Sequence, residues 1–280
     1  MAPGSHNRGM PRILLTNDDG IDSEGLHVLA RAMRAHGEVV VVAPDSEYSG
    51  AGAALGALHL IRPDVHRVTL DGLDEVWTVA GPPALCVRFA VAGAFGPALF
   101  DMVVAGINPG ANTSARTPYH SGTIGAVLTG RNAGLTGVAV SQDVTVGAIE
   151  GQAWDDMLVG QRWATAGEVA SQIVGDLLSE PPNEPSALNV NVPNLELDEL
   201  RGWRYTSLAT RPGRSITAVR LDPKPGHHDA YSASFEWGLP SEPDPLSDVG
   251  SVRDGYVSLT WLSRISALHA PTAALDARIG

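Results

Sequence analysis

Cysteine and basic residues are scarce in this sequence. Cys86 is the single cysteine among 280 residues, so no disulfide can form within the chain and a reducing compartment is expected. Lysine and arginine total 19 against 31 acidic residues, which gives a formal net charge of −12. A surface that follows a nucleic-acid backbone needs clustered basic side chains, so this charge argues against a nucleic-acid polymer as partner. A small anionic substrate stays compatible, because a bound metal ion can reverse the local charge.

Long apolar runs are also missing. No segment approaches the roughly 18 consecutive apolar residues that a membrane-spanning helix requires. Residues 1–9 (MAPGSHNRG) lack the apolar centre of a secretory signal, and their Gly-Ser-His stretch resembles an expression-vector remnant. We therefore leave residues 1–9 out of the fold prediction and expect a soluble, cytoplasmic protein without a membrane partner.

Three well-known nucleotide-binding and hydrolase motifs do not support an assignment. Gly-x-x-x-x-Gly-Lys-Ser/Thr is absent, which excludes a P-loop. Gly-x-Gly-x-x-Gly does not follow the first predicted strand, which weakens a dinucleotide-binding interpretation. No Gly-x-Ser-x-Gly elbow is present to indicate a serine nucleophile on an α/β-hydrolase fold.

What the sequence does contain is an alternation of apolar runs and amphipathic helical patterns. Residues 12–16 are a short apolar run, residues 26–33 repeat apolar side chains at helical spacing, and residues 39–43 are typical of a strand buried on both faces. Asp22 or Ser23 can cap the helix. Strand, helix and strand make a βαβ unit with parallel strands. Further strands are predicted at 76–79, 102–105, 138–140 and 188–192, and further helices at 82–94, 124–132 and 168–178. The pattern predicts an α/β fold with a doubly wound, mostly parallel sheet.

The amino-acid composition changes after Pro193, where proline and glycine become frequent and helical periodicity fades. Short strand candidates remain at 216–221 and 256–262. We therefore divide the chain into an α/β catalytic core at residues 10–195 and an irregular β-rich extension at residues 196–280. The extension is expected to be an oligomerisation element.

Paired carboxylates follow the first predicted strand, in Asn17-Asp18-Asp19-Gly20. Ligands of open parallel sheets bind outside the carboxyl ends of the strands, which is where this cluster falls. Two adjacent buried carboxylates repel each other and lose hydration, and a hard divalent cation relieves both penalties. The alternative is an ordinary turn, since Asn, Asp and Gly are common turn residues.

Two more polar clusters follow later strands. Ser49 and Gly50 end the loop after residue 43, and the serine hydroxyl could reach a metal ion or a phosphate, or simply cap a turn. Asn108 and Asn112 lie in the Gly-rich stretch GINPGAN after residue 105. They offer amide oxygens and donors on a backbone that can approach a ligand closely. The alternative is a loop whose Asn side chains bond to their own backbone.

A last cluster opens the helix predicted from residue 124. Free backbone N–H groups and the helix dipole make a helix start an anion site, and the hydroxyls of Ser121 and Thr123 beside Gly122 would add donors to a phosphate. The alternative is simple N-capping by these residues. His120 is either a general acid or a surface histidine.

The combination of these motifs, in this order and spacing, resembles the SurE family of survival-protein nucleotidases. The resemblance implies a Rossmann-like core, a C-terminal extension exchanged between subunits, and a homodimer or homotetramer. It implies a phosphomonoesterase that releases phosphate from nucleoside monophosphates with the help of one divalent metal ion, Mg²⁺ or Mn²⁺. Asp18, Asp19, Ser49 and Asn108 match the family's metal ligands.

The remaining site residues are assigned on the same basis. We predict catalytic roles for Asp18, Asp19, Asn112 and Ser121. We predict substrate or phosphate contacts for Asn17, Ser49, Gly50, Asn112, Ser121, Gly122 and Thr123.

The sequence also departs from the family pattern. Pro82 and Leu85 stand where the family has Thr and Asp, and His120 is inserted between Tyr119 and Ser121. None of these departures removes a predicted metal ligand. They leave two alternatives open: a phosphatase specialised for one phosphorylated biosynthetic intermediate, and an inactive nucleotide-binding or scaffold protein.

Overall fold

The computed structural model describes residues 9–70, 72–96, 99–144, 158–211, 216–238 and 242–267. The strands are β1 (Arg12–Thr16), β2 (Glu38–Pro44), β3 (Val65–Arg67), β4 (Glu75–Val79), β5 (Met102–Pro109), β6 (Thr136–Gln142), β7 (Ala187–Val192), β8 (Trp203–Tyr205), β9 (Ile216–Pro223), β10 (Tyr231–Trp237) and β11 (Val257–Leu262). The helices are α1 (Glu24–Met33), α2 (Pro83–Val91), α3 (Gly122–Asn132), α5 (Trp163–Ser179) and α6 (Asp248–Arg253), with 3-10 turns η1 (Thr117–Tyr119) and η2 (Leu197–Glu199). The expression remnant predicted at residues 1–9 lies outside the described residues, except for Gly9.

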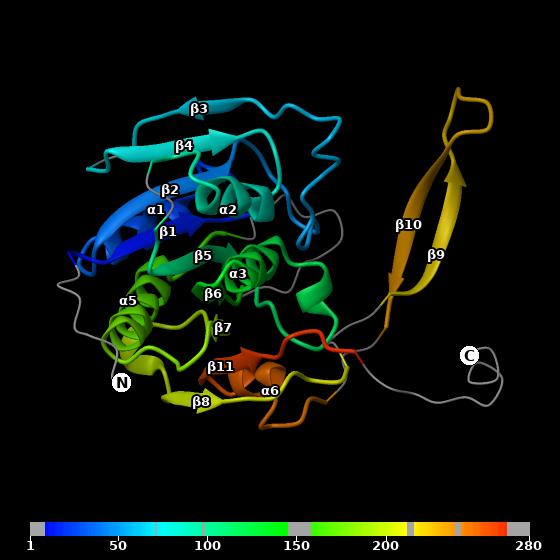
Figure 1. The fold of residues 1–280 in the computed structure, drawn as a ribbon. Coiled ribbons are helices and arrows are strands. Elements are labelled where there is room, and N and C mark those ends of the chain that lie inside the picture. Colours follow the sequence, from blue (N-terminus) through cyan, green and yellow to red (C-terminus); the bar gives the residue numbers. More distant parts are fainter. Residues whose placement is uncertain are drawn as a thin grey trace, which may run out of the picture.

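Within the described residues, nine strands form one sheet in the order β3-β4-β2-β1-β5-β6-β7-β11-β8 (Figure 1). The strands from β4 to β7 pair in parallel, whereas β3 and β11 run antiparallel to β4 and β7. The predicted α/β fold with a mostly parallel, doubly wound sheet is confirmed.

Helices cover both faces of this sheet. Helices α1 and α5 pack together on one face, and α2 and α3 pack together on the other (Figure 1). Each face buries its own apolar core, one built around Leu26, Leu29 and Val169, the other around Leu85 and Ile124. Because the central strands contribute to both cores, they are continuous apolar runs and not alternating ones.

Strand register brings the predicted site loops to one edge. β1 lies between β2 and β5, and Thr16 at its end pairs with Ala105. β1 ends at this pair while β5 continues to Pro109, so the loop that carries Asp18 begins beside the last residues of β5, which include Asn108. Ser23 caps α1, with its Oγ accepting from the N–H of Leu26 at 3.4 Å.

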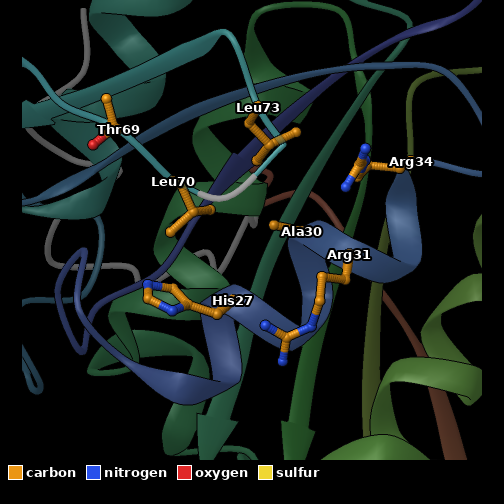
Figure 2. Close-up of a pocket in the computed structure, with 7 residues that line it drawn as sticks. All are labelled: His27, Ala30, Arg31, Arg34, Thr69, Leu70 and Leu73. Atoms are coloured by element: carbon orange, nitrogen blue, oxygen red, sulfur yellow. The ribbon is translucent and has the colours of Figure 1, made fainter.

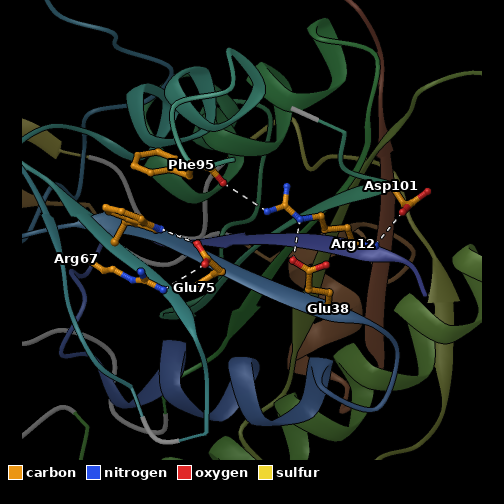
Figure 3. Close-up of polar contacts among 7 residues, drawn as sticks. Arg12, Glu38, Arg67, Glu75, Phe95 and Asp101 are labelled. Carbon is orange, nitrogen blue, oxygen red and sulfur yellow. Dashed lines mark hydrogen bonds and ion pairs between the residues drawn. The ribbon is translucent and has the colours of Figure 1, made fainter. Parts of the chain in front are cut away.

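The amino edge of the same sheet carries paired charges (Figure 3). Arg12 Nε donates to Glu38 Oε1 at 2.9 Å, and the backbone N–H of Arg12 donates to Asp101 Oδ2 at 2.8 Å. Arg67 pairs with Glu75 at 3.2 Å. These contacts join the start of β1 to the start of β2 and to the residue before β5, and the end of β3 to the start of β4.

The C-terminal part differs from the prediction in its detail. β11 pairs with β7, and β8 pairs with β11, so both belong to the main sheet. Strands β3, β8 and β10 and helix α6 had no predicted counterpart; β3 and β8 have only three residues each, too few for a periodicity. Helix α5 begins at Trp163, five residues before the predicted start.

The hairpin of β9 and β10 stands away from the body of the molecule (Figure 1). Six of its large apolar side chains are between 41% and 62% exposed: Ile216, Val219, Leu221, Tyr231, Phe235 and Trp237. An isolated two-stranded hairpin is at best marginally stable in water, so this element needs a partner surface. None of the helices that the structure describes combines the length and the apolar character required to cross a membrane.

Candidate metal and phosphate site

Asp18 lies directly after β1 and is held by the start of helix α3. Its side chain is almost fully buried, and Thr123 Oγ1 donates to Asp18 Oδ1 at 2.5 Å. Gly122 allows this approach, since a Cβ there would lie 2.7 Å from the Cβ of Asp18. Burial raises the pKa of Asp18, and the bond from Thr123 opposes that rise. Two predicted residues 105 positions apart are thus in direct contact.

Asp19 carries an unsatisfied carboxylate. Both of its side-chain oxygens are buried, and neither has a hydrogen-bond partner among the described residues. Burial, then the charge of Asp18, then that of Glu47 raise the pKa of Asp19 to about 8. Buried charges in proteins are normally paired or bound to a metal ion. An added cation would resolve the excess of negative charge here.

The loop of residues 45–50 contacts the residues that follow β1. The backbone N–H of Tyr48 donates to the Asp18 carbonyl at 2.7 Å, which fixes the loop against the end of β1. Glu47 accepts from the Ser49 N–H at 2.7 Å, and both residues are exposed. Ser49 and Gly50 follow Tyr48 in this loop, and their contact with a metal ion or a phosphate stays a prediction. Glu47 was not predicted, although it lies in the same sequence cluster.

Asn108 lies at the end of β5, next to β1 in the sheet. Its Nδ2 donates to the carbonyls of Gly110 at 2.6 Å and Pro109 at 3.3 Å. With the nitrogen held by its own loop, the Oδ1 remains available as a ligand atom. Residues on either side of Asn108, Ile107 and Pro109, line the same cavity as Asp19.

Two other predicted residues, Asn17 and Ser121, form hydrogen bonds with residues near them in the sequence. Asn17 Nδ2 donates to Ser23 Oγ at 2.7 Å and to the Gly20 carbonyl at 2.8 Å, so it shapes the turn between β1 and α1. Ser121 is the N-cap of α3, with its Oγ accepting from the N–H of Ile124 at 3.1 Å. The capping alternative for Ser121 is therefore realised, and it leaves the hydroxyl hydrogen free to donate.

Asn112 is anchored on the far side of the site. Its Nδ2 donates to Ser141 Oγ at 2.9 Å, and its carbonyl accepts from Asn189 Nδ2 at 2.8 Å and Asn191 Nδ2 at 3.2 Å. Asn189 and Asn191 are fully buried on β7. No described contact joins Asn112 to Asp18 or Asp19, so its phosphate role stays a prediction.

Asp248 connects the loop that contains Asn112 and Ser114 to the C-terminal segment. This fully buried carboxylate accepts from the backbone N–H groups of Ser114 at 2.7 Å, Ala209 at 2.9 Å and Val249 at 2.8 Å. Burial raises the pKa of Asp248, while the three N–H groups lower it. Sequence reasoning missed Asp248, because only the fold reveals that residues 114 and 248 meet.

The described residues contain no group of three or more His, Cys, Asp and Glu side chains suited to a metal ion. The predicted ligand set combines two carboxylates with hydroxyl and amide oxygens, and such oxygen ligands suit Mg²⁺ or Mn²⁺. A separate cavity of about 200 Å³ lies on the outer side of α1, where His27, Arg31 and Arg34 face Leu70 and Leu73 (Figure 2). None of the predicted site residues lines it.

The altered segment at Pro82–Leu85 belongs to the apolar core. Leu85 is fully buried, and a Cβ at Gly81 would lie 2.7 Å from its Cδ2. Its side chain thus packs in the apolar core that includes Leu14 and Val40. His120, the inserted residue, is exposed, and its carbonyl accepts from the Gly52 N–H at 2.8 Å.

Comparison with known proteins settles the family. The family model described as Survival protein SurE matches residues 13–215. The chain belongs to the SurE family. The 5'-nucleotidase SurE of Aeromonas hydrophila is 35% identical over 273 residues, covering 95% of this chain and 97% of that protein. The 5'-nucleotidase SurE of Haemophilus influenzae is 35% identical over 264 residues, covering 92% and 94%.

A solved structure supports the same assignment. The crystal structure of the SurE protein from Aquifex aeolicus superimposes with a TM-score of 0.71 at 30% sequence identity, covering 90% of this chain and 93% of that one. Both the sheet and the family implied by the sequence motifs are therefore confirmed for this SurE-family chain.

Proposed function

We propose that this chain is a divalent-metal-dependent phosphomonoesterase that hydrolyses nucleoside monophosphates. The observation that carries the proposal is the Asp19 carboxylate, which is buried without a partner beside a second buried carboxylate. Membership of the SurE family supports it, since the relatives above are named 5'-nucleotidases.

The residues at this edge fit one Mg²⁺ or Mn²⁺ ion. Asp18, Asp19, Ser49 and Asn108 would hold it with oxygen atoms. When bound, such an ion polarises a phosphoryl oxygen and lowers the pKa of water toward neutrality.

The protein's own groups prepare the reaction around that position. Thr123 fixes the Asp18 carboxylate by its hydrogen bond, and Asp19 keeps an oxygen with which to orient the attacking water. The first N–H group of α3, at Gly122, has no acceptor within the helix and would be available to an anion, whereas the Thr123 N–H bonds to Asp18. Together with the Ser121 hydroxyl and Asn112, the Gly122 N–H would stabilise the charge on the phosphoryl oxygens in the transition state.

The experiment is phosphate release from a panel of nucleoside monophosphates, with added Mg²⁺ or Mn²⁺ and with excess chelator. We expect turnover with metal and loss of turnover in chelator that is restored by adding metal back. Equal turnover in both conditions would refute the metal role. Release from a single non-nucleotide phosphomonoester alone would favour the specialised phosphatase instead.

We also propose that the extension forms a homo-oligomer through the β9–β10 hairpin. Its apolar side chains are exposed on a ribbon that stands away from the body, and a second copy of the chain would cover them. Replacing Val219 and Phe235 by Ser should shift the protein to a smaller species in sedimentation. A matched double substitution at the neighbouring cross-strand pair, whose side chains point to the other face of the ribbon, is Ala218→Ser with Glu236→Gln, and it should leave the oligomer unchanged. A monomeric parent protein would contradict the proposal.

The cytoplasmic location stays a proposal drawn from the single cysteine. Cys86 is buried in the apolar core, and burial raises the pKa of its thiol, so it is an unreactive structural side chain. Fractionation of cells that produce the protein tests the location directly.

A further inference from the structure

A cavity of about 330 Å³ opens beside Asp19, at the carboxyl edge of the sheet. One wall is polar and comes from the loop between β1 and α1 and from the first residue of α1: Asp19, Asp22, Ser23 and Glu24. The facing wall is apolar and consists of Ile107, Pro109, Leu158 and Trp163. Its size is at the lower end for small-molecule sites, which run from about 300 Å³.

Trp163 forms the aromatic part of that wall and is held firmly. It is the first residue of α5, and the carbonyl of the preceding Arg162 accepts from Gln142 Nε2 at 2.8 Å. Gln142 is fully buried at the end of β6, so the start of α5 is fixed to the sheet. The indole packs partly against the apolar core, which leaves the remainder of the ring to line the cavity.

Gly25 lies close to both the indole of Trp163 and the backbone of β5. A Cβ at this position would lie 3.1 Å from Trp163 Cζ3 and 2.1 Å from the Ile107 carbonyl oxygen. Any side chain there would therefore push against both the ring and the β5 backbone. The absence of a side chain lets α1 approach the indole closely.

The charges around the cavity fix which end of a substrate it takes. Asp22 and Glu24 are exposed at its polar wall, and Glu24 is only partly offset by Arg31 at 3.0 Å. A phosphate would be repelled here, whereas the N–H donors of a neutral heterocycle would find acceptors. The phosphoryl group belongs instead at Asp19 and the start of α3.

From this arrangement, and resting on the proposed function, we propose that Trp163 stacks on the base of the nucleotide substrate. The cavity between Trp163 and the Asp22–Glu24 loop is then the nucleobase subsite. Specificity for nucleotides over sugar phosphates arises from this stack, because every base has a planar π-face that an aromatic side chain can cover.

The test compares adenosine 5′-monophosphate with ribose 5-phosphate, which has the same sugar and phosphate but no base. In Trp163→Ala we expect kcat/KM for the nucleotide to fall about 10-fold, as for the loss of one base–aromatic stack. The value for ribose 5-phosphate should change less than about 2-fold. Trp163→Phe should restore most of the nucleotide activity, and the remote Trp203→Ala should match the parent protein for both substrates.

Equal loss for both substrates, or no loss for either, would overturn the subsite. Binding of adenosine itself, measured by equilibrium dialysis, gives a readout that needs no hydrolysis. The parent protein should bind adenosine at least about 10-fold more tightly than Trp163→Ala, and equal binding would also overturn the proposal. If neither substrate releases phosphate, the hydrolase proposal fails while the adenosine measurement still decides the subsite.

Discussion

The two edges of the parallel sheet use charge in opposite ways. At the amino edge, Arg12 meets Glu38 and Arg67 meets Glu75, so each carboxylate lies against a guanidinium (Figure 3). At the carboxyl edge, Asp18 and Asp19 adjoin each other and Glu47, and no described Lys, Arg or His side chain forms an ion pair with Asp18 or Asp19.

The difference separates stabilising charges from functional ones. Charges that only hold strands together are neutralised within the fold, at the amino edge. A protein that leaves two buried carboxylates uncompensated loses stability at that place, and such local losses are expected where a ligand completes the structure. The uncompensated carboxylates at the carboxyl edge therefore support our proposal that a cation binds there.

The largest expected effect comes from removing one uncompensated charge. Asp19→Asn keeps the shape of the side chain but loses the charge that would hold the cation and orient water. We expect kcat for nucleoside monophosphates to fall by about 10²–10³-fold, the loss typical of removing one stabiliser of transition-state charge. The matched amino-edge variant, Glu38→Gln, should keep parental kcat. Comparable losses in both variants would erase the distinction between the edges.

A smaller effect is expected from the asparagines that anchor the Asn112 loop. Asn191→Leu removes a side-chain donor to the Asn112 carbonyl while keeping a similar volume. We expect kcat to fall about 10-fold, as for residues that support a ligand indirectly. Thr206→Val is the control, because its hydroxyl contacts Ser258 and Thr260 in the same polar layer but does not contact Asn112. Steady-state kinetics on folded protein would show whether only Asn191 affects turnover.

The pH dependence of stability gives a third test, made on metal-free protein. The pKa of Asp19 in the folded state is about 8, above the ordinary 3.8, so the folded state binds the extra proton between these values. Its contribution to stability is fully present below pH 3.8 and is lost as the pH rises through about 8. In chelator at pH 8, Asp19→Asn should therefore unfold at a higher temperature than the parent, by about 2–4 °C for each kcal/mol.

Melting curves of the same two proteins can also contradict the prediction about Asp19. Added Mn²⁺ should raise the unfolding temperature of the parent protein and leave that of Asp19→Asn nearly unchanged. A variant that unfolds below the parent in chelator at pH 8 would mean that the Asp19 charge is already compensated in the metal-free fold.

The smallest effect belongs to the amino edge itself. The Arg12–Glu38 pair is partly exposed, with 49% of the Glu38 side chain accessible, and such pairs contribute about 0–1 kcal/mol. Glu38→Gln should lower the free energy of unfolding by no more than this in a denaturant titration. A loss of several kcal/mol would show that the amino edge depends on charge far more than its geometry indicates.

Much of this molecule could be predicted from the sequence, for physical reasons. The central strands are continuous apolar runs because both faces are buried, and Ser23 begins α1 because its hydroxyl caps a free N–H. The loops with Asp18, Ser49 and Asn108 could be placed at one edge because parallel strands share a direction.

The features that could not be predicted from the sequence depend on contacts between residues that are distant in the chain. The bond from Thr123 to Asp18 could be suspected only from family resemblance, and the anchoring of Ser114 by Asp248 gave no local pattern at all. Short strands such as β8 (Trp203–Tyr205) form because β11 offers them an edge, and not because three residues have a strong preference. Trp163 lay outside the predicted helix, so its place beside Asp19 was not foreseen.

The central claim is that one cation completes the carboxyl edge, and anomalous scattering from crystals grown with Mn²⁺ tests it most directly. We predict a single strong peak per chain, within ligand distance of Asp18, Asp19 and the Asn108 Oδ1, that is lost in Asp19→Asn. A peak that persists at another location, or Asp19 carboxylate oxygens that remain without a cation at saturating Mn²⁺, would contradict the account.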